Sequence, residues 1–112
     1  MSEKVSKKFE IKTDNEGVGG EKYILQLFIS SIQSNSSRAV INIKAICEKY
    51  LKGRYELEII DIYEQPALVL SEEIIAIPLL IKRFPLPEQR MIGDLSDTEK
   101  VLRGLQIIYR LK

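Results

Sequence analysis

The spacing of apolar and polar residues changes twice along the first half of the chain and predicts strand, helix and strand. Residues 23–29 are rich in β-branched and aromatic types and apolar on both faces, which favours a central strand covered on both sides. Small polar residues at 30–37 can cap a helix, apolar residues then recur at helical spacing over 39–51, and Gly53 is placed to end that helix. Residues 55–62 begin with the alternation of a strand. Together these segments indicate a βαβ unit.

The second half has a less regular pattern. Residues 67–73 favour a short helix, and residues 74–81 are almost wholly apolar with Pro78 in the middle. Because proline cannot donate to a central β-ladder, we expect this segment to bend, to lie at a sheet edge or to carry a cis bond. Residues 84–87 predict a stiff connector, and residues 90–93 a short edge strand.

The last predicted element is a helix near the C-terminus. Ser96 and Glu99 have the spacing of a capping box, and Asp94 and Asp97 would complement the positive end of the helix dipole. An apolar stripe follows at helical spacing: Val101, Leu102, Leu105, Ile108 and Leu111.

The element order β-α-β-(α)-β-β-α is that of a thioredoxin-like α/β domain. In that fold the proline before the third strand is normally cis and faces the start of the first helix, and Ile77-Pro78 stands in this place. We expect a single folded domain over residues 22–112, preceded by a flexible extension at residues 1–21 that ends in a glycine-rich segment.

Composition excludes several classes of protein. With 112 residues, 45% of them hydrophobic and 29% charged, the chain can form one core. No apolar run reaches the ~18 residues of a membrane span, and the N-terminus lacks the apolar stretch of a secretory signal, so we expect a cytoplasmic protein. A net charge of +1 does not favour nucleic acid as a partner.

The missing residue types narrow the chemistry. The chain has no histidine, which removes histidine-dependent triads and the commonest zinc ligand, and its single cysteine cannot form an internal disulfide. We therefore expect no enzyme, no metal and no cofactor. Cys47 lies on the apolar stripe of the first helix, which indicates a buried packing residue; a redox-sensing thiol is the alternative.

Charges are unevenly distributed along the chain. Residues 56–73 contain six acidic side chains and no lysine or arginine, whereas basic residues gather from Lys82 onward. Paired carboxylates can do acid–base or metal work, but the spacing of Glu56 and Glu58 suits one solvated strand face. Opposite charge on two regions of one small domain favours self-association or docking on a charged partner.

A longer motif near the C-terminus carries a family resemblance. The run Met91-Ile92-Gly93-Asp94-Leu95-Ser96-Asp97-Thr98-Glu99-Lys100-Val101-Leu102, followed by Gly104-Leu105 and Ile108-Tyr109, resembles the C-terminal signature of the KaiB family of circadian clock proteins. The similarity continues through residues 23–29, 35–39, 55–61 and 76–78, and so covers roughly residues 22–110.

This resemblance implies a function and two folds. Members of the KaiB family are not known as enzymes; they bind the ATPase KaiC and are similar to the sensor domain of the histidine kinase SasA. The family is metamorphic, with a tetrameric ground state whose second half is not thioredoxin-like and a rarer thioredoxin-like monomer that binds KaiC. The resemblance thus implies a regulatory adaptor for a KaiC-type ATPase or a histidine-kinase-type protein, and a homo-oligomer, either dimer or tetramer.

The resemblance also implies roles for individual residues. Arg38 matches a basic docking residue, whereas Glu58 and Glu73 replace docking lysines, which suggests a divergent member with a different partner surface. The positions that match the family's fold switch or oligomer contacts are Tyr23, Pro78, Gly104, Gln106 and Tyr109, with Gln106 standing where an aspartate is usual. Gly104 either penalises a long final helix or permits close packing.

Overall fold

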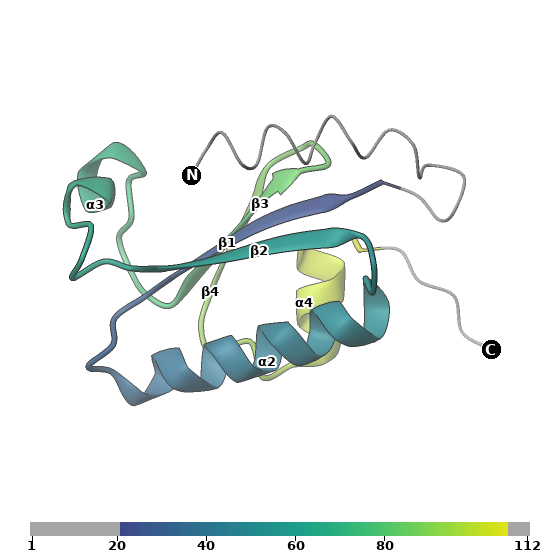
Figure 1. The fold of residues 1–112 in the computed structure, drawn as a ribbon, viewed down its shortest axis with the longest axis horizontal. Coiled ribbons are helices and arrows are strands. Elements are labelled where there is room, and N and C mark those ends of the chain that lie inside the picture. The colour runs from purple at the N-terminus through teal and green to yellow at the C-terminus, as the bar shows by residue number, and fades with distance from the viewer. Residues whose placement is uncertain (1–20, 108–112) are drawn as a thin grey trace.

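The computed structural model describes residues 21–107, which form one four-stranded sheet with helices on both faces (Figure 1). The predicted extension at residues 1–21 lies outside this range except for its last residue. The elements, in chain order, are β1 (Tyr23–Ile29), α2 (Ser34–Tyr50), β2 (Tyr55–Asp61), α3 (Ala67–Ser71), β3 (Leu79–Phe84), β4 (Gln89–Ile92) and α4 (Thr98–Gly104).

The strand order is β2-β1-β3-β4, which confirms the thioredoxin-like arrangement expected from the sequence. Strands β1 and β2 run parallel, as the βαβ unit requires, and β3 runs antiparallel to both β1 and β4. Strands β2 and β4 form the two edges. Helices α2 and α4 cover one face of the sheet, and α3 lies over one end of the opposite face (Figure 1).

The main core fills the space between the sheet and the two helices α2 and α4. Alternate residues of β1, among them Leu25 and Leu27, point toward these helices because successive side chains of a strand face opposite ways. Ile43 and Cys47 meet them from α2, and Leu102 meets them from α4. This layer fixes the position of α2 beside the sheet.

A smaller core lies on the opposite face, under α3. Phe28 of β1, Ile60 of β2 and Ile81 of β3 pack there with Ile74, which follows α3. Elsewhere this face carries a network of polar side chains and a groove beside β4, both described below. Within the described part of the chain, no helix is long and apolar enough to cross a membrane.

The proline-containing segment confirms one of the expected possibilities. The Ile77–Pro78 peptide bond is cis, and β3 begins directly after it as a central strand that pairs with both β1 and β4. The predicted connector at residues 84–87 joins β3 to the edge strand β4, as expected.

The final helix differs from the prediction at both ends. Asp97, not Ser96, is the N-cap, and its carboxylate accepts a hydrogen bond from the backbone N–H of Lys100 at 3.2 Å. The Ser96 N–H instead bonds to the carboxylate of Asp94 at 3.1 Å, so the expected capping box does not form. The helix ends at Gly104, so Leu105 lies beyond it, and the predicted stripe residues 108 and 111 are outside the described residues.

Two helices end in the same way. The N–H of Ile107 bonds to the carbonyl of Leu102, and the N–H of Gln106 to that of Arg103, which is the Schellman pattern. The same pair of bonds closes α3 around Glu73. Gln106 and Glu73 therefore occupy left-handed positions with φ of 58° and 56°, where glycine is usual.

Candidate partner-binding surfaces

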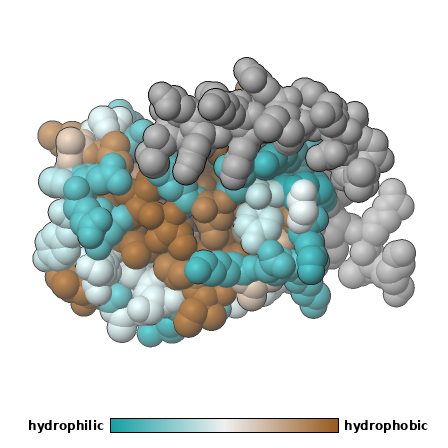
Figure 2. Space-filling view, in the orientation of Figure 1, coloured by the Kyte–Doolittle hydropathy of each residue, from teal (hydrophilic) through white to brown (hydrophobic). Residues whose placement is uncertain are grey.

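One side of the molecule, formed by α2 and the edge strand β2, exposes apolar side chains. Val40 of α2, with Leu57 and Ile59 of β2, pack against the main core without being fully buried, and Ile41 of α2 is 66% exposed. Figure 2 shows apolar atoms gathered on this side, where β2 and α2 lie. We call Val40, Ile41, Leu57 and Ile59 the α2/β2 surface. Within residues 21–107 no strand pairs with the outer side of β2, and an apolar surface beside such an edge suits a protein partner.

Arg38 lies near the start of α2 and contacts the loop before α4. Its Nε is 3.3 Å from the Asp94 carboxylate, and the Asn42 side-chain amide donates to the Asp94 carbonyl at 2.8 Å. Hydrogen bonds from Ser96 and from Arg38 hold the pKa of Asp94 below its ordinary value. The Arg38 side chain remains 57% exposed, so it is held in place yet accessible.

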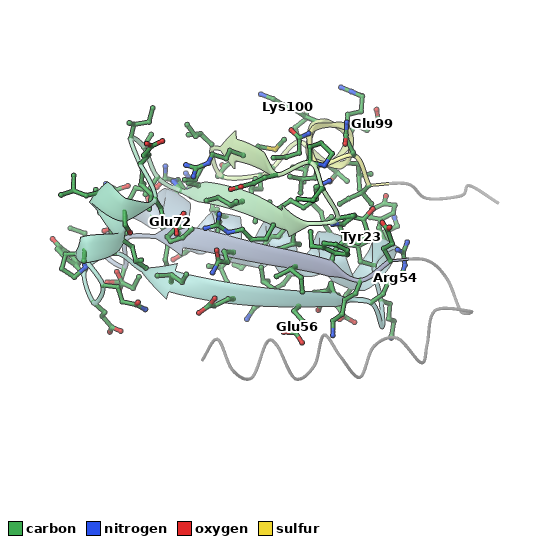
Figure 3. The ribbon with its side chains drawn as sticks, turned by 90° about the horizontal axis from the view of Figure 1, so that it is seen from above. Tyr23, Arg54, Glu56, Glu72, Glu99 and Lys100 are labelled. Atoms are coloured by element: carbon green, nitrogen blue, oxygen red, sulfur yellow. The ribbon has the colours of Figure 1, made fainter. Side chains whose placement is uncertain are left out.

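Glu58 lies on the opposite face of the sheet, at one end of a polar network. It accepts a hydrogen bond from the Gln26 side chain at 2.9 Å, and Gln26 in turn accepts one from Arg83 at 2.7 Å. Arg83 also donates to the carboxylates of Glu72 and Glu88, each at 2.7 Å. Figure 3 shows Glu72 at the α3 end of the sheet. Arg83 thus pairs with Glu72 and Glu88, whereas Glu58 accepts its hydrogen bond from the neutral Gln26 amide.

Glu73 lies at a groove between the α3–β3 loop and β4. Its carbonyl accepts a hydrogen bond from Arg90 at 3.4 Å. The groove has a volume of about 540 Å³ and is lined by Glu73, Ile75, Ala76, Leu79, Glu88, Arg90 and Ile92. Arg38, Glu58 and Glu73 consequently do not form one cluster: Arg38 belongs to the helix-covered face, and the other two belong to the opposite one.

Tyr23 and Gln106, both assigned to the fold switch, do meet. The Tyr23 hydroxyl donates to the Gln106 carbonyl over 3.5 Å, which joins the start of β1 to the end of α4. Arg54 lies 5.5 Å and Lys82 5.9 Å from the centre of the Tyr23 ring. Figure 3 shows Tyr23 and Arg54 together at one end of the sheet.

Lys82 is a residue that the sequence reasoning missed. It is only 1% exposed, and burial lowers its pKa, an effect that the carboxylate of Glu21 partly opposes. The burial of Lys82 could have been predicted from the sequence, because Lys82 follows the apolar Leu80 by two residues in a strand and must share that residue's face. It contributes a buried positive charge beside the Tyr23 ring.

Gly104 permits a close approach. A Cβ at this position would overlap the Cε methyl of Met91 in β4. Because Gly104 is the last residue of α4, it does not interrupt a long helix, and close packing is the effect that the structure supports. Pro78 is fully buried, and its carbonyl accepts a hydrogen bond from Gly93 at 3.0 Å. Tyr109 lies outside the described residues.

The Cys47 thiol is buried inside α2, as predicted from its place on the apolar stripe. Burial raises its pKa to about 12, with a smaller contribution from the charge of Glu48. Such a thiol stays protonated at physiological pH and is a poor nucleophile. The described residues contain no group of three or more potential metal ligands.

Comparison with known structures supports the fold. The N-terminal domain of SasA from Synechococcus elongatus superposes with a TM-score of 0.63 at 24% identity, covering 85% of this chain and 93% of that domain. Mitochondrial thioredoxin 3 from Saccharomyces cerevisiae also gives a TM-score of 0.63, at 11% identity, over 88% of this chain and 90% of that chain. Both likenesses establish a thioredoxin-like fold.

Comparison with known sequences identifies the family. The KaiB domain family matches residues 26–107. The circadian clock oscillator protein KaiB of Prochlorococcus marinus subsp. pastoris is 45% identical over 92 residues, which is 82% of this chain and 86% of that protein. The circadian clock protein KaiB3 of Synechocystis sp. is 46% identical over 87 residues, 78% of this chain and 85% of that protein. With the fold and the relatives in agreement, this chain belongs to the KaiB family of circadian clock proteins.

Proposed function

We propose that this protein is a non-enzymatic regulatory adaptor in the cytoplasm that binds a KaiC-type ATPase or a related histidine-kinase-type signalling protein. The observation that carries the proposal is the α2/β2 surface, where apolar side chains stay accessible beside an edge strand. Interfaces of this kind combine a partly apolar centre with a charged rim. Arg38, which Asp94 holds near the start of the same helix α2, adds an exposed positive charge to that helix.

The charge pattern suggests how the partner differs from the usual one. Arg38 keeps a basic docking position, while Glu58 and Glu73 place acidic groups on the other face. A partner that contacts both faces would need to present acidic groups to Arg38 and basic groups to Glu58 and Glu73. This requirement favours a dedicated partner over one shared with other members of the family.

The binding test is direct. The protein is incubated for a long period with the KaiC homologue of its source and ATP, and complex formation is followed by size-exclusion chromatography. We expect a complex that Ile41→Asp and Arg38→Glu weaken at least about tenfold, because each places a wrong charge in the interface. Leu70→Asp, at a still more exposed apolar position on α3, serves as the control. Absence of a complex in every nucleotide state would exclude the KaiC partner, and the kinase sensor would be tested in the same assay.

We further propose that the protein switches between two folds and that one of them is a dimer or tetramer. Tyr23 and Gln106 support this part, because their hydrogen bond joins the two halves in the thioredoxin-like arrangement described above. Slow binding is expected if the competent fold is a minor population.

Amide NMR spectra test the switch. Two slowly exchanging sets of peaks are expected, and Tyr23→Phe, which removes only the hydroxyl, should change their ratio. Gly104→Ala should also change the ratio, since the added methyl must displace the Met91 side chain. Analytical ultracentrifugation of the same variants reports assembly. A single set of peaks and an unchanged mass in both variants would contradict the switch.

A further inference from the structure

The second edge of the sheet carries a groove of which the proposed function uses only one lining residue, Glu73. Strand β4 is at the edge opposite to β2, and within residues 21–107 no strand pairs with its outer side. The groove beside it is bordered by two exposed isoleucines, Ile75 at 89% and Ile92 at 53% exposure. Exposed aliphatic side chains on both walls of a groove are costly in water and favour an occupant.

The register of β4 determines which backbone groups face outward. The N–H of Gly93 bonds to the carbonyl of Pro78, and these two residues lie directly opposite each other. Opposing pairs in antiparallel strands alternate between bonded and non-bonded, so Met91 bonds to β3, whereas Arg90 and Ile92 turn their N–H and C=O groups away from it. The outer edge thus offers two donors and two acceptors.

The same two residues present their side chains to the groove. Arg90 and Ile92 both line it, because residues two apart in a strand share a face. A strand added to this edge would place alternate side chains over Ile92 and Ile75. A single added strand could therefore both pair with the backbone of β4 and bury its side chains in the groove.

Charge defines one further property of the occupant. The Glu88 carboxylate is paired with Arg83, and Arg90 lies within 4.0 Å of both Glu72 and Glu88. The Glu73 carboxylate, at the groove wall, has no hydrogen bond or ion pair within the described residues. A basic side chain would complement it.

We propose that the outer edge of β4 binds an extended segment of a partner protein as an additional strand. The segment has a branched apolar residue over Ile92 and Ile75 and a lysine or arginine two positions away that pairs with Glu73. This is strand addition, in which backbone bonds supply affinity and the groove supplies selectivity. The added strand lies on the edge opposite the α2/β2 surface, and it shares only Glu73 with the contacts proposed for the KaiC-type partner.

A short peptide tests this proposal on the full chain. The probe is a seven-residue, acetylated and amidated peptide of threonines with one valine and one lysine two positions apart. In ¹H–¹⁵N spectra we expect saturable shifts of the Arg90 and Ile92 amides. N-methylation of the valine and lysine of the peptide, which blocks their backbone donors but keeps the side chains, should weaken binding about tenfold or more.

Protein variants separate the side-chain contributions. Ile92→Asp should abolish the shifts, whereas Ile41→Asp, at a somewhat more exposed isoleucine on α2, should leave them unchanged. Replacing the peptide lysine by glutamate should weaken binding about fivefold to the wild type and hardly at all to Glu73→Gln. Equal binding of the N-methylated peptide, shifts at β2 instead of β4, or the absence of any saturable shift would overturn the proposal. Shifts at β4 that depend on protein concentration without peptide would assign the edge to a second copy of this chain and overturn it too.

Discussion

The two halves of this domain reach their structures by different means. In the βαβ half, the 17-residue helix α2 ends before Gly53, which adopts the positive φ of 80° that glycine tolerates. In the second half, the helices have 5 and 7 residues, and every described non-glycine residue with positive φ lies there: Glu73, Leu95 and Gln106. Local preference and tertiary structure agree in the first half and conflict in the second.

This difference has an energetic meaning. Side chains with a Cβ pay roughly 1 kcal/mol or more in the left-handed region, and that cost must be met by contacts elsewhere. A half that relies on such contacts is closer in free energy to an alternative packing than one supported by its own propensities. The comparison is thus consistent with a switch confined to the second half.

The largest expected effect tests the first half. Ile43, fully buried on α2, loses its packing in Ile43→Ala, and we expect the free energy of unfolding to fall by about 2–5 kcal/mol. Ile41→Ala, on the same helix but exposed, should change it by less than about 0.5 kcal/mol. Urea denaturation of both variants measures the difference in their free energies of unfolding. Similar losses of stability in the two variants would mean that α2 packs on the sheet through a different face.

The next effect concerns the buried charge in the second half. Lys82→Met should raise the free energy of unfolding by about 1–3 kcal/mol, because an apolar residue of similar length needs no charge in the core.

Its pH dependence gives a second test. Because the pKa of Lys82 is lower in the folded state than its ordinary 10.5, the unfolded chain binds more protons between those two values. Wild-type stability should therefore rise relative to the variant as pH increases through that window. A constant difference between pH 7 and 10.5 would show that Lys82 is not desolvated.

A smaller effect distinguishes the observed cap of α4 from the predicted one. Asp97→Ala removes the acceptor for the Lys100 N–H and should cost about 1 kcal/mol. Ser96→Ala should cost much less, because the serine is not the N-cap. Thermal unfolding of the two variants measures the difference. A larger loss of stability for Ser96→Ala would show that Ser96, as in the predicted capping box, is the N-cap.

Removing the backbone strain at the non-glycine residues with positive φ should raise the free energy of unfolding by a smaller amount. Gln106→Gly and Glu73→Gly each replace a side chain at positive φ, and we expect a stabilisation of about 0.5–1 kcal/mol apiece after the entropy cost of glycine is included. Gly53→Ala in the first half should have the opposite sign. Denaturant midpoints test all three, and destabilisation by both glycine variants would contradict the strain argument.

The smallest expected effect is a lack of reactivity. With a pKa of about 12 and no exposure, Cys47 should resist thiol reagents at pH 8 in the native state and react fully in urea. A colorimetric thiol assay with and without urea makes the comparison. Rapid native labelling would revive the redox-sensing alternative.

The sequence predicted β1 with its correct bounds because its apolar residues are needed on both faces of the sheet. It predicted the cis bond at Pro78 as one of three possibilities, and only the sheet could decide among them. The ends of α4 could not be predicted, because Asp97 and Ser96 are both good caps and because the helix closes around Gln106, a non-glycine residue at positive φ. The hydrogen bonds of Arg83 could not be predicted either, because its partners come from separate segments that only the folded chain brings together.

Arg83 has a consequence for which substitutions the chain can accept. Its three guanidinium nitrogens reach Gln26 in β1, Glu72 after α3 and Glu88 in the connector to β4. A lysine would carry the same charge, but its donors radiate from a single atom and cannot reach three acceptors that lie apart. At position 83, therefore, conserving the charge does not conserve the structure. A lysine there would lose some of the hydrogen bonds that join β1, the residue after α3 and the connector to β4.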